Sequence, residues 1–378
     1  MDASNRTILI SMVSNLYKDM LRTIFSKLET KVQFLYDSKQ NPLATHVKSK
    51  LPTSFKPCKF ISRPLVQMAL HRMIYGAKKI MYTRRTTKFR DGLADCHLDI
   101  LMPHDHDIEA HPSKVLFVCH GLGGSSASSY CKNIALNARR LGWTTVIYNR
   151  RGHASKNEGH YPTHYDPDDM CDALEFVKVV FKGGIEAILG VGYSLGANLL
   201  VKYTGEHPNK HPFKAIISVG NGFDLQVGVA ALSIIDPLAD QISGMFVAKI
   251  ISNHEKLQKN KDIQAQLALY KRFIDIDTYI MQMTKGMDFN MENYYKNASS
   301  ANAIANINIP ILAIASKDDP FVMSGMSYYI DGHVLNPSNW CSLLTNHGGH
   351  IGWLEGIRCA SWLDQVICTF ADSVLSYT

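Results

Sequence analysis

The sequence predicts an α/β fold in which a mostly parallel central sheet is covered by helices on both faces. From about residue 81 onward, short β-branched runs alternate with helical patterns, the order typical of such a sheet. Most of these runs are apolar at nearly every position, as expected of strands that are buried on both faces. The 378 residues are 46% hydrophobic and 19% charged, which allows a sizeable core in a soluble globular protein.

Residues 1–60 are expected to form a helical extension. The apolar stretch Thr7–Tyr17 is too short to span a bilayer, and no secretory signal with a cleavage site is apparent. Two interpretations stay open: the extension packs on the domain, or it makes peripheral contact with a membrane surface. Apolar residues at helical spacing support both: Leu9, Val13, Leu16, Met20, Ile24 and Leu28.

Residues 61–378 are expected to form one domain built on this sheet. An Asp91-Gly92 turn, followed by alternating apolar and polar residues, predicts an antiparallel hairpin at the sheet edge. A final helix is predicted over Ala360–Leu375. Buried strands are predicted at 114–120, 144–149, 186–193, 214–220, 310–316 and 340–346.

Residues 221–308 contain no comparable strand pattern and are predicted to form a helical cap. The segment is apolar and rich in Met, including ISGMFVAKII and YIMQMTKGM. Met side chains adapt to irregular ligands, so the cap is expected to form an apolar wall over an active site. The alternative is that these residues are simply core.

The candidate nucleophile is Ser194 in the sequence Gly192-Tyr193-Ser194-Leu195-Gly196. GxSxG alone is a loose pattern, but here a strand-like run precedes it and a helical run follows. That is the context of a nucleophile elbow, a turn too sharp for large neighbours that presents the hydroxyl at the sheet edge.

A serine hydroxyl needs a base to remove its proton, and His350 is preferred to His347 because two glycines give it an uncrowded approach. The carboxylate that orients the base is expected after the preceding strand, where Asp318 and Asp319 are both candidates. The chain order Ser, Asp, His is the one expected of the α/β-hydrolase fold.

The oxyanion formed on attack needs backbone N–H donors. Leu195, directly after the nucleophile, is expected to supply one. Leu122 in the glycine-rich HGLGG segment at 120–124 is the candidate for the second, because glycines allow close backbone approach. Together these features predict a serine hydrolase.

Several segments resemble a known family. HGLGG, NRRG, GYSLGANLL, GNGFDL, YYKNASS, ASKDDPF and NHGGHIGWLEG are similar to the ABHD group of α/β-hydrolases. The narrower likeness is to the branch that holds ABHD proteins one to three, YheT-like esterases, plant embryogenesis-associated proteins and yeast ethyl-ester synthase/esterases. The resemblance covers Phe55 to the C-terminus. It implies Asp319 as acid, His350 as base, and lipid esters such as acylglycerols or phospholipids as substrates.

The expected activity is hydrolysis of carboxylic esters of lipids with medium to long acyl chains, through an acyl-enzyme on Ser194. An acyltransferase that uses the same triad is the alternative, and a non-catalytic lipid-binding protein with this fold is a third interpretation. No cofactor and no metal are expected. His104, His106 and His111 miss the spacing of common metal sites and are expected in a solvated loop.

The net charge of +7 is too mild and scattered to indicate nucleic-acid binding. The eight cysteines form no CxxC pair and are expected to be reduced and mostly buried. A cytoplasmic location is therefore expected, with peripheral membrane association as an addition.

Overall fold

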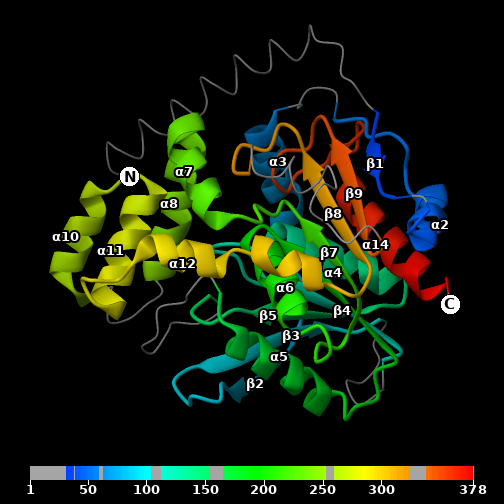
Figure 1. The fold of residues 1–378 in the computed structure, drawn as a ribbon, viewed down its shortest axis with the longest axis horizontal. Helices are drawn as coiled ribbons and strands as arrows, with labels where there is room; N and C mark the ends of the chain where they lie inside the picture. The colour runs from blue at the N-terminus through cyan, green and yellow to red at the C-terminus, as the bar shows by residue number, and fades with distance from the viewer. Residues whose placement is uncertain are drawn as a thin grey trace, which may run out of the picture.

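The computed structural model describes residues 31–37, 39–58, 63–103, 112–153, 165–252, 259–322 and 338–377. These residues build a nine-stranded sheet in the order β1-β9-β8-β7-β6-β4-β5-β3-β2 (Figure 1). The strands are β1 (Gln33–Leu35), β2 (Thr83–Lys88), β3 (Asp95–Leu101), β4 (Lys114–Cys119), β5 (Thr144–Asn149), β6 (Ala187–Tyr193), β7 (Phe213–Val219), β8 (Ile311–Ser316) and β9 (Trp340–Thr345).

The six central strands are parallel, and antiparallel strands close the sheet at both edges. β5, β4, β6, β7, β8 and β9 pair in parallel, and β5, β8 and β9 are buried at every position. At one edge the predicted hairpin of β2 and β3 is present, and β3 joins β5. At the other edge β1 joins β9. The predicted fold class is therefore confirmed.

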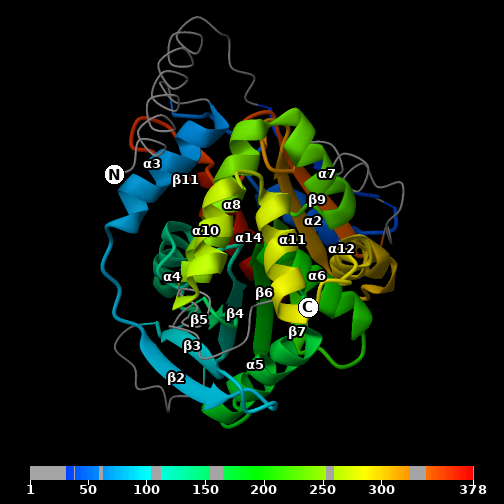
Figure 2. The same ribbon diagram turned by 90° about the vertical axis from the view of Figure 1, so that its left-hand side faces the viewer.

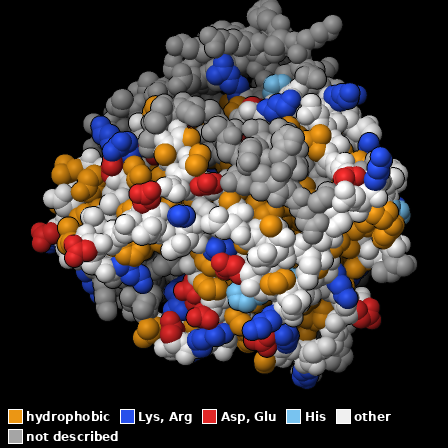
Figure 3. All heavy atoms as spheres, in the orientation of Figure 1, with side chains coloured by type: hydrophobic (Ala, Val, Ile, Leu, Met, Phe, Trp, Pro, Cys, Tyr) orange, Lys and Arg blue, Asp and Glu red, His pale blue; other side chains and the backbone are white. Residues whose placement is uncertain are grey.

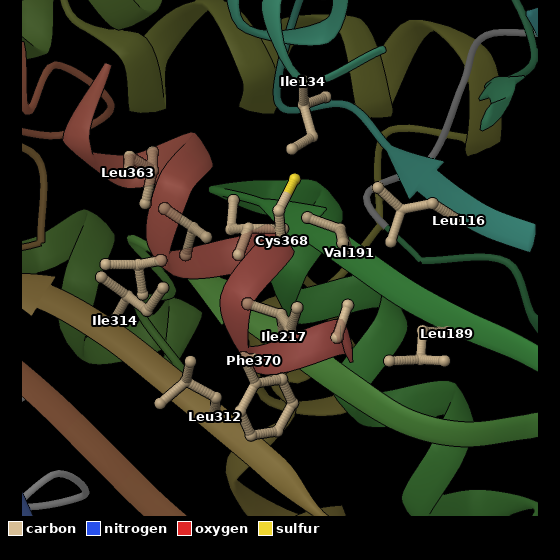
Figure 4. Close-up of a cluster of buried hydrophobic side chains, with 14 of the residues drawn as sticks. Leu116, Ile134, Leu189, Val191, Ile217, Leu312, Ile314, Leu363, Cys368 and Phe370 are labelled. Atoms are coloured by element: carbon tan, nitrogen blue, oxygen red, sulfur yellow. The ribbon is translucent and has the colours of Figure 1, made fainter. Parts of the chain in front are cut away.

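Helices cover both faces of the sheet. On one face, α4 (Ser129–Arg140), α14 (Trp362–Leu375) and α2 (Pro42–Lys50) bury apolar side chains against the strands. Figure 4 shows part of this layer, where Leu363, Cys368 and Phe370 of α14 lie over Val191, Ile217 and Leu312. On the other face lie α5 (Pro167–Val180), α6 (Leu195–Glu206) and the 3₁₀ helix η1 (Ala301–Asn306). Alternate residues of β4 belong to the two layers, as the period of a strand requires.

The described part of the expected extension belongs to the same body as the domain. β1 pairs with β9, and Ala44 and Val47 of α2 are buried in the core layer of α14. α3 (Pro64–Gly76) follows and packs on α4. The expected boundary at residue 60 therefore coincides with no break in the packing. The helix predicted over residues 9–28 lies outside the described residues.

The cap consists of helices inserted between β7 and β8: α7 (Leu225–Ile235), α8 (Pro237–Ser252), α10 (Lys261–Leu269), α11 (Phe273–Lys285) and α12 (Met291–Ala298). It lies beside the sheet in Figure 1 and faces the viewer in Figure 2. The cap has a small core of its own, which includes Val247, Ile280 and Tyr295. Of the Met residues, Met281 is core and Met245 lines a cavity, so both interpretations of the Met-rich segment hold in part.

The chain enters and leaves the cap at neighbouring points. The Ala301 N–H donates to the Phe223 carbonyl at 3.0 Å, and the Leu225 N–H donates to Ser299 Oγ at 2.8 Å. The last part of the predicted interval, η1, packs on α6 and so lies on the sheet rather than in the cap.

Within the described residues, no single helix is long and apolar enough to cross a membrane. The bent pair Leu225–Leu232 and Pro237–Ala248 together has the length and composition of a membrane span.

On the face in Figure 3, basic and acidic side chains are interspersed over the described surface.

Candidate functional site

Ser194 sits on a sharp turn between β6 and α6. Its backbone has φ of +55° and ψ of −123°, a conformation that a residue with a side chain adopts only under strain. The turn requires glycine on both sides. A Cβ on Gly192 would lie 2.4 Å from Ala197 Cα, and one on Gly196 would lie 2.4 Å from the carbonyl oxygens of Cys119 and His120. The predicted nucleophile elbow is therefore present in the structure.

The turn brings Ser194 to the predicted base and acid. Ser194 Oγ lies 2.7 Å from His350 Nε2, and His350 Nδ1 lies 2.7 Å from Asp319 Oδ2. Asp319 follows β8 and is 1% exposed, and its Oδ1 accepts the N–H groups of Phe321 and Val322 at 2.9 and 3.2 Å. This hydrogen-bonded chain can move a proton from serine to imidazole while a fixed carboxylate stabilises the imidazolium.

The two residues left as alternatives form a separate pair. His347 Nδ1 lies 3.4 Å from Asp318 Oδ2, and Asp318 Oδ1 accepts the N–H of Gly349 at 2.9 Å. Through this hydrogen bond, Asp318 stabilises the loop that carries His350. The geometry thus selects Asp319 and His350 as the partners of Ser194, because neither Asp318 nor His347 contacts it.

The oxyanion loop runs directly against the elbow. A Cβ on Gly121 would lie 3.1 Å from both Ser194 Cβ and the Tyr193 carbonyl oxygen, so a side chain there would push the loop or the elbow aside. The Gly121 N–H donates to the hydroxyl of Tyr130 at 3.0 Å, which leaves the next amide, that of Leu122, as the donor nearest in sequence. Among the described residues, no acceptor is found for the N–H of Leu122 or Leu195, and both residues line the cavity in front of Ser194.

Tyr130 is a site residue that the sequence analysis did not identify. It lies in the first turn of α4, its ring is tilted by 45° to that of Tyr193 with ring centroids 4.8 Å apart, and its hydroxyl accepts the N–H of Gly121. Burial raises the pKa of its hydroxyl, so the group stays protonated. The only local signal was its place shortly after HGLGG, and the residue spacing there does not reveal the contact.

A cavity of about 770 Å³ opens over Ser194 and His350 between the cap and the sheet. Its cap side is mostly apolar: Leu225, Val229, Leu232, Met245, Phe246 and Phe273. On the opposite side, α3, the loop before α4 and the first residue of α4 contribute polar groups: His71, Arg72, Ser125, Ser128 and Ser129. Met68 and Gly76 of α3 also line it. The cavity volume lies within the range of small-molecule sites, roughly 300–1,000 Å³.

His71 is the polar residue buried in the α3 wall. Its Nδ1 lies 3.0 Å from Ser129 Oγ, and burial, with a smaller effect of nearby Lys78, lowers its pKa to about 4. His71 is therefore neutral at pH 7 and adds no charge to the cavity. The role of α3 as a wall was not predicted, because its segment precedes the first strand that the sequence predicts.

Among the described residues, no cluster of three or more His, Cys, Asp or Glu side chains could hold a metal ion. His104, His106 and His111 lie outside the described residues. All eight cysteines are free thiols, and all except the partly exposed Cys171 are buried.

Fold and site together define a protein of the serine-hydrolase type: a strained serine after a central strand, a histidine, a buried aspartate and a glycine-rich oxyanion loop. A family model described as the alpha/beta hydrolase fold matches residues 114–357. The chain belongs to this family.

The curated relatives fall in the branch that the motifs predicted. The chain is 28% identical over 272 residues to embryogenesis-associated protein EMB8 of Picea glauca, an alignment that covers 69% of this chain and 58% of that protein. It is 27% identical over 281 residues to a monoacylglycerol lipase of Saccharomyces cerevisiae, with 71% and 61% covered. With phospholipase ABHD3 of Bos taurus it shares 25% over 329 residues, with 82% and 76% covered.

The chain thus spans less than two thirds of the length of the first two of these relatives. Among solved structures, the Pyrococcus furiosus esterase Pf2001 is similar with a TM-score of 0.50 and 14% identity, and the match covers 79% of this chain and 92% of that chain. At this identity the likeness supports the fold alone.

Proposed function

We propose that the protein is a serine hydrolase that cleaves carboxylic esters of lipids. The observation that carries the proposal is the hydrogen-bonded chain from Ser194 through His350 to Asp319, which opens into a largely apolar cavity under the cap. Relatives named monoacylglycerol lipase and phospholipase support lipid esters as the substrate class. The flexible Met245 and the aromatic Phe246 and Phe273 of the cavity wall suit an acyl chain.

In the first step, Ser194 Oγ attacks the ester carbonyl carbon while His350 Nε2 accepts the hydroxyl proton. The negative charge that develops on the carbonyl oxygen is stabilised by the N–H groups of Leu122 and Leu195. His350 then gives its proton to the leaving alcohol, and the acyl group remains on Ser194.

In the second step, water attacks the acyl carbon. His350 accepts a proton from this water and returns it to Ser194 Oγ as the carboxylic acid departs. Asp319 keeps the imidazole ring aimed at Ser194 through its fixed position and stabilises the positive charge on the ring.

The test uses a fluorophosphonate probe on the wild type, Ser194→Ala and a matched serine control. Ser243→Ala is that control, because Ser243 also lines the cavity but its hydroxyl donates to the Ala239 carbonyl at 3.0 Å. We expect labelling of the wild type and of Ser243→Ala, and none of Ser194→Ala. The same three proteins are then assayed on p-nitrophenyl esters of increasing acyl length and on a monoacylglycerol.

A folded wild type that neither reacts with the probe nor turns over any ester would contradict the proposal. Equal labelling of Ser194→Ala would also contradict it, since another residue would then be the nucleophile. Turnover confined to the shortest esters would preserve the mechanism but overturn lipids as the substrate class.

A further inference from the structure

α3 carries two exposed apolar side chains outside its buried row. Gln67, His71 and Tyr75 point into the protein, whereas Met73 is 73% exposed and Ile74 is 37% exposed. Soluble proteins expose single apolar residues routinely, but neighbouring ones mark interaction surfaces.

A second element packed on α3 extends this apolar surface. The hairpin of β10 (Leu354–Glu355) and β11 (Ala360–Ser361) carries Ile357, which is 85% exposed, in its turn. Figure 2 shows β11 beside α3.

Hydrogen bonds and a shared core fix the hairpin to α3. The Leu354 N–H donates to Gln67 Oε1 at 2.9 Å, and the Tyr75 hydroxyl donates to the Cys359 carbonyl at 2.9 Å. Cys58, Tyr75, Leu354 and Cys359 share one small core. The hairpin that carries Ile357 is therefore held against α3.

The charge around these apolar groups is one-sided. The 27 residues from Pro64 to Arg90 contain seven Lys and Arg residues and no Asp or Glu. Some of these cations are used elsewhere, as Arg84 is by Asp99 at 2.7 Å. In contrast, no carboxylate pairs with Arg72, Lys79 or Arg358 among the described residues.

The acid on the hairpin is partly buried and has a backbone partner. Glu355 Oε1 accepts the N–H of Lys56 at 3.1 Å. We call the resulting surface the docking face. It consists of the exposed apolar residues Met73, Ile74, Met81 and Ile357 with the cations Lys79 and Arg358.

The docking face lies on the outside of the helix whose inner side forms the cavity wall. Met68, His71 and Arg72 of α3 line the cavity above Ser194. A binding partner on the docking face is thus separated from the substrate cavity by α3.

We propose that the docking face rests on a bilayer that contains anionic phospholipid, so that lipid substrate reaches Ser194 past α3. Apolar side chains rimmed by unpaired cations suit such a surface, because the apolar groups enter the interface and the cations meet anionic head groups. The inference rests on the proposed function only for the class of substrate, since binding of the face to vesicles requires no turnover.

The test measures flotation of the full chain with vesicles of phosphatidylcholine alone and with added phosphatidylglycerol. The test variant is Met73→Glu/Ile357→Glu, and neither residue lines the cavity. The control is Leu141→Glu/Val179→Glu, two aliphatic residues that are 47% and 70% exposed at the C-terminal ends of α4 and α5. The cavity lies at the carboxyl ends of the parallel strands, whereas these helix ends lie near the amino ends of the strands.

We expect the wild type and the control to bind the anionic vesicles. The test variant should bind at least about tenfold more weakly, because the two Glu side chains replace apolar groups that would enter the bilayer interface and are repelled by the anionic head groups. Binding should weaken as salt increases from 0.05 to 0.5 M, because salt screens the cations. Turnover of a soluble p-nitrophenyl ester should be the same in all three proteins, while turnover of vesicle-embedded ester falls in the test variant alone.

Equal vesicle binding by both variants would overturn the proposal, as would a wild type that binds no anionic vesicle. A test variant that only disrupts a dimer, seen by light scattering, with unchanged vesicle binding, would reassign the face to a second copy of the chain. A wild type that binds the vesicles but turns over no ester would refute the proposed function, while the proposed membrane contact of the docking face would be supported.

Discussion

The substitution Asp319→Asn tests the catalytic chain at its most buried member. The two oxygens of Asp319 have different partners: Oδ1 accepts the N–H groups of Phe321 and Val322, and Oδ2 faces His350 Nδ1. In the variant, the amide oxygen will take the place of Oδ1, because only an oxygen can accept those backbone donors. The NH₂ group then faces His350.

An NH₂ group donates, so His350 Nδ1 must become the acceptor and the ring proton must move to Nε2. Nε2 lies 2.7 Å from Ser194 Oγ, and a protonated Nε2 cannot accept the serine proton. From this wrong tautomer we expect kcat to fall by about 10⁴-fold, or about 5.5 kcal/mol of transition-state stabilisation. Folding should change little, because both backbone hydrogen bonds are kept.

The chain offers a matched control one residue away. Asp318→Asn removes the same charge, but Asp318 contacts His347 and the Gly349 amide rather than His350. We expect less than about a tenfold loss of kcat/KM on p-nitrophenyl butyrate, with melting temperatures measured on both variants. Equal losses in the two variants, or more than a tenth of wild-type activity in Asp319→Asn, would refute the reasoning.

Three further substitutions test the surroundings of the site. Tyr130→Phe leaves the buried Gly121 N–H without its acceptor, so we expect a loss of about 1–3 kcal/mol in thermal unfolding and a fall in kcat rather than a rise in KM. Gly196→Ala places a Cβ 2.4 Å from two carbonyl oxygens, and a variant with normal stability and kcat would contradict that packing. Burial raises the pKa of Asp364 to about 7, so the folded state keeps a proton that the unfolded chain releases above its ordinary value of 3.8. Stability should therefore fall as pH rises from 4 to 7, by at most about 1.4 kcal/mol per unit, and urea unfolding of Asp364→Asn should show a flatter dependence.

The central strands were predictable because their residues are apolar on both faces. Predicted strands such as 114–120 and 340–346 differ from β4 and β9 by a single terminal residue. β1 was not predicted, because Gln33–Leu35 is too short to show a period and its stability comes from β9, some 300 residues later in the chain. A pairing at that separation leaves no local trace.

The edge hairpin shows where alternation alone gives an incomplete prediction. Asp99 alternates with apolar residues and would ordinarily face solvent, yet it is buried. Burial raises the pKa of Asp99, but hydrogen bonds from Arg84, Ser126 and Asn149 outweigh this effect and hold it below the ordinary value. Partners from three separate segments cannot be read from the strand itself.

The choice between the two acids and the two histidines also depended on tertiary structure. Both pairs occupy the same two loops, and residue spacing does not distinguish them. The flanking glycines indicated His350, and the family resemblance indicated Asp319. The backbone N–H groups that hold Asp319 provide the physical reason for that choice.

The joined ends of the cap have a consequence for how substrate preference can change. Because residues 225–298 leave and rejoin the sheet at one point, with Phe223 bonded to Ala301 and Leu225 to Ser299, β7 and β8 stay fixed whatever the intervening helices do. The cap carries most of the apolar cavity wall, whereas Ser194, Asp319 and His350 lie after the ends of β6, β8 and β9. Selection can therefore exchange the cap as a module and alter the acyl group accepted without disturbing the chemistry.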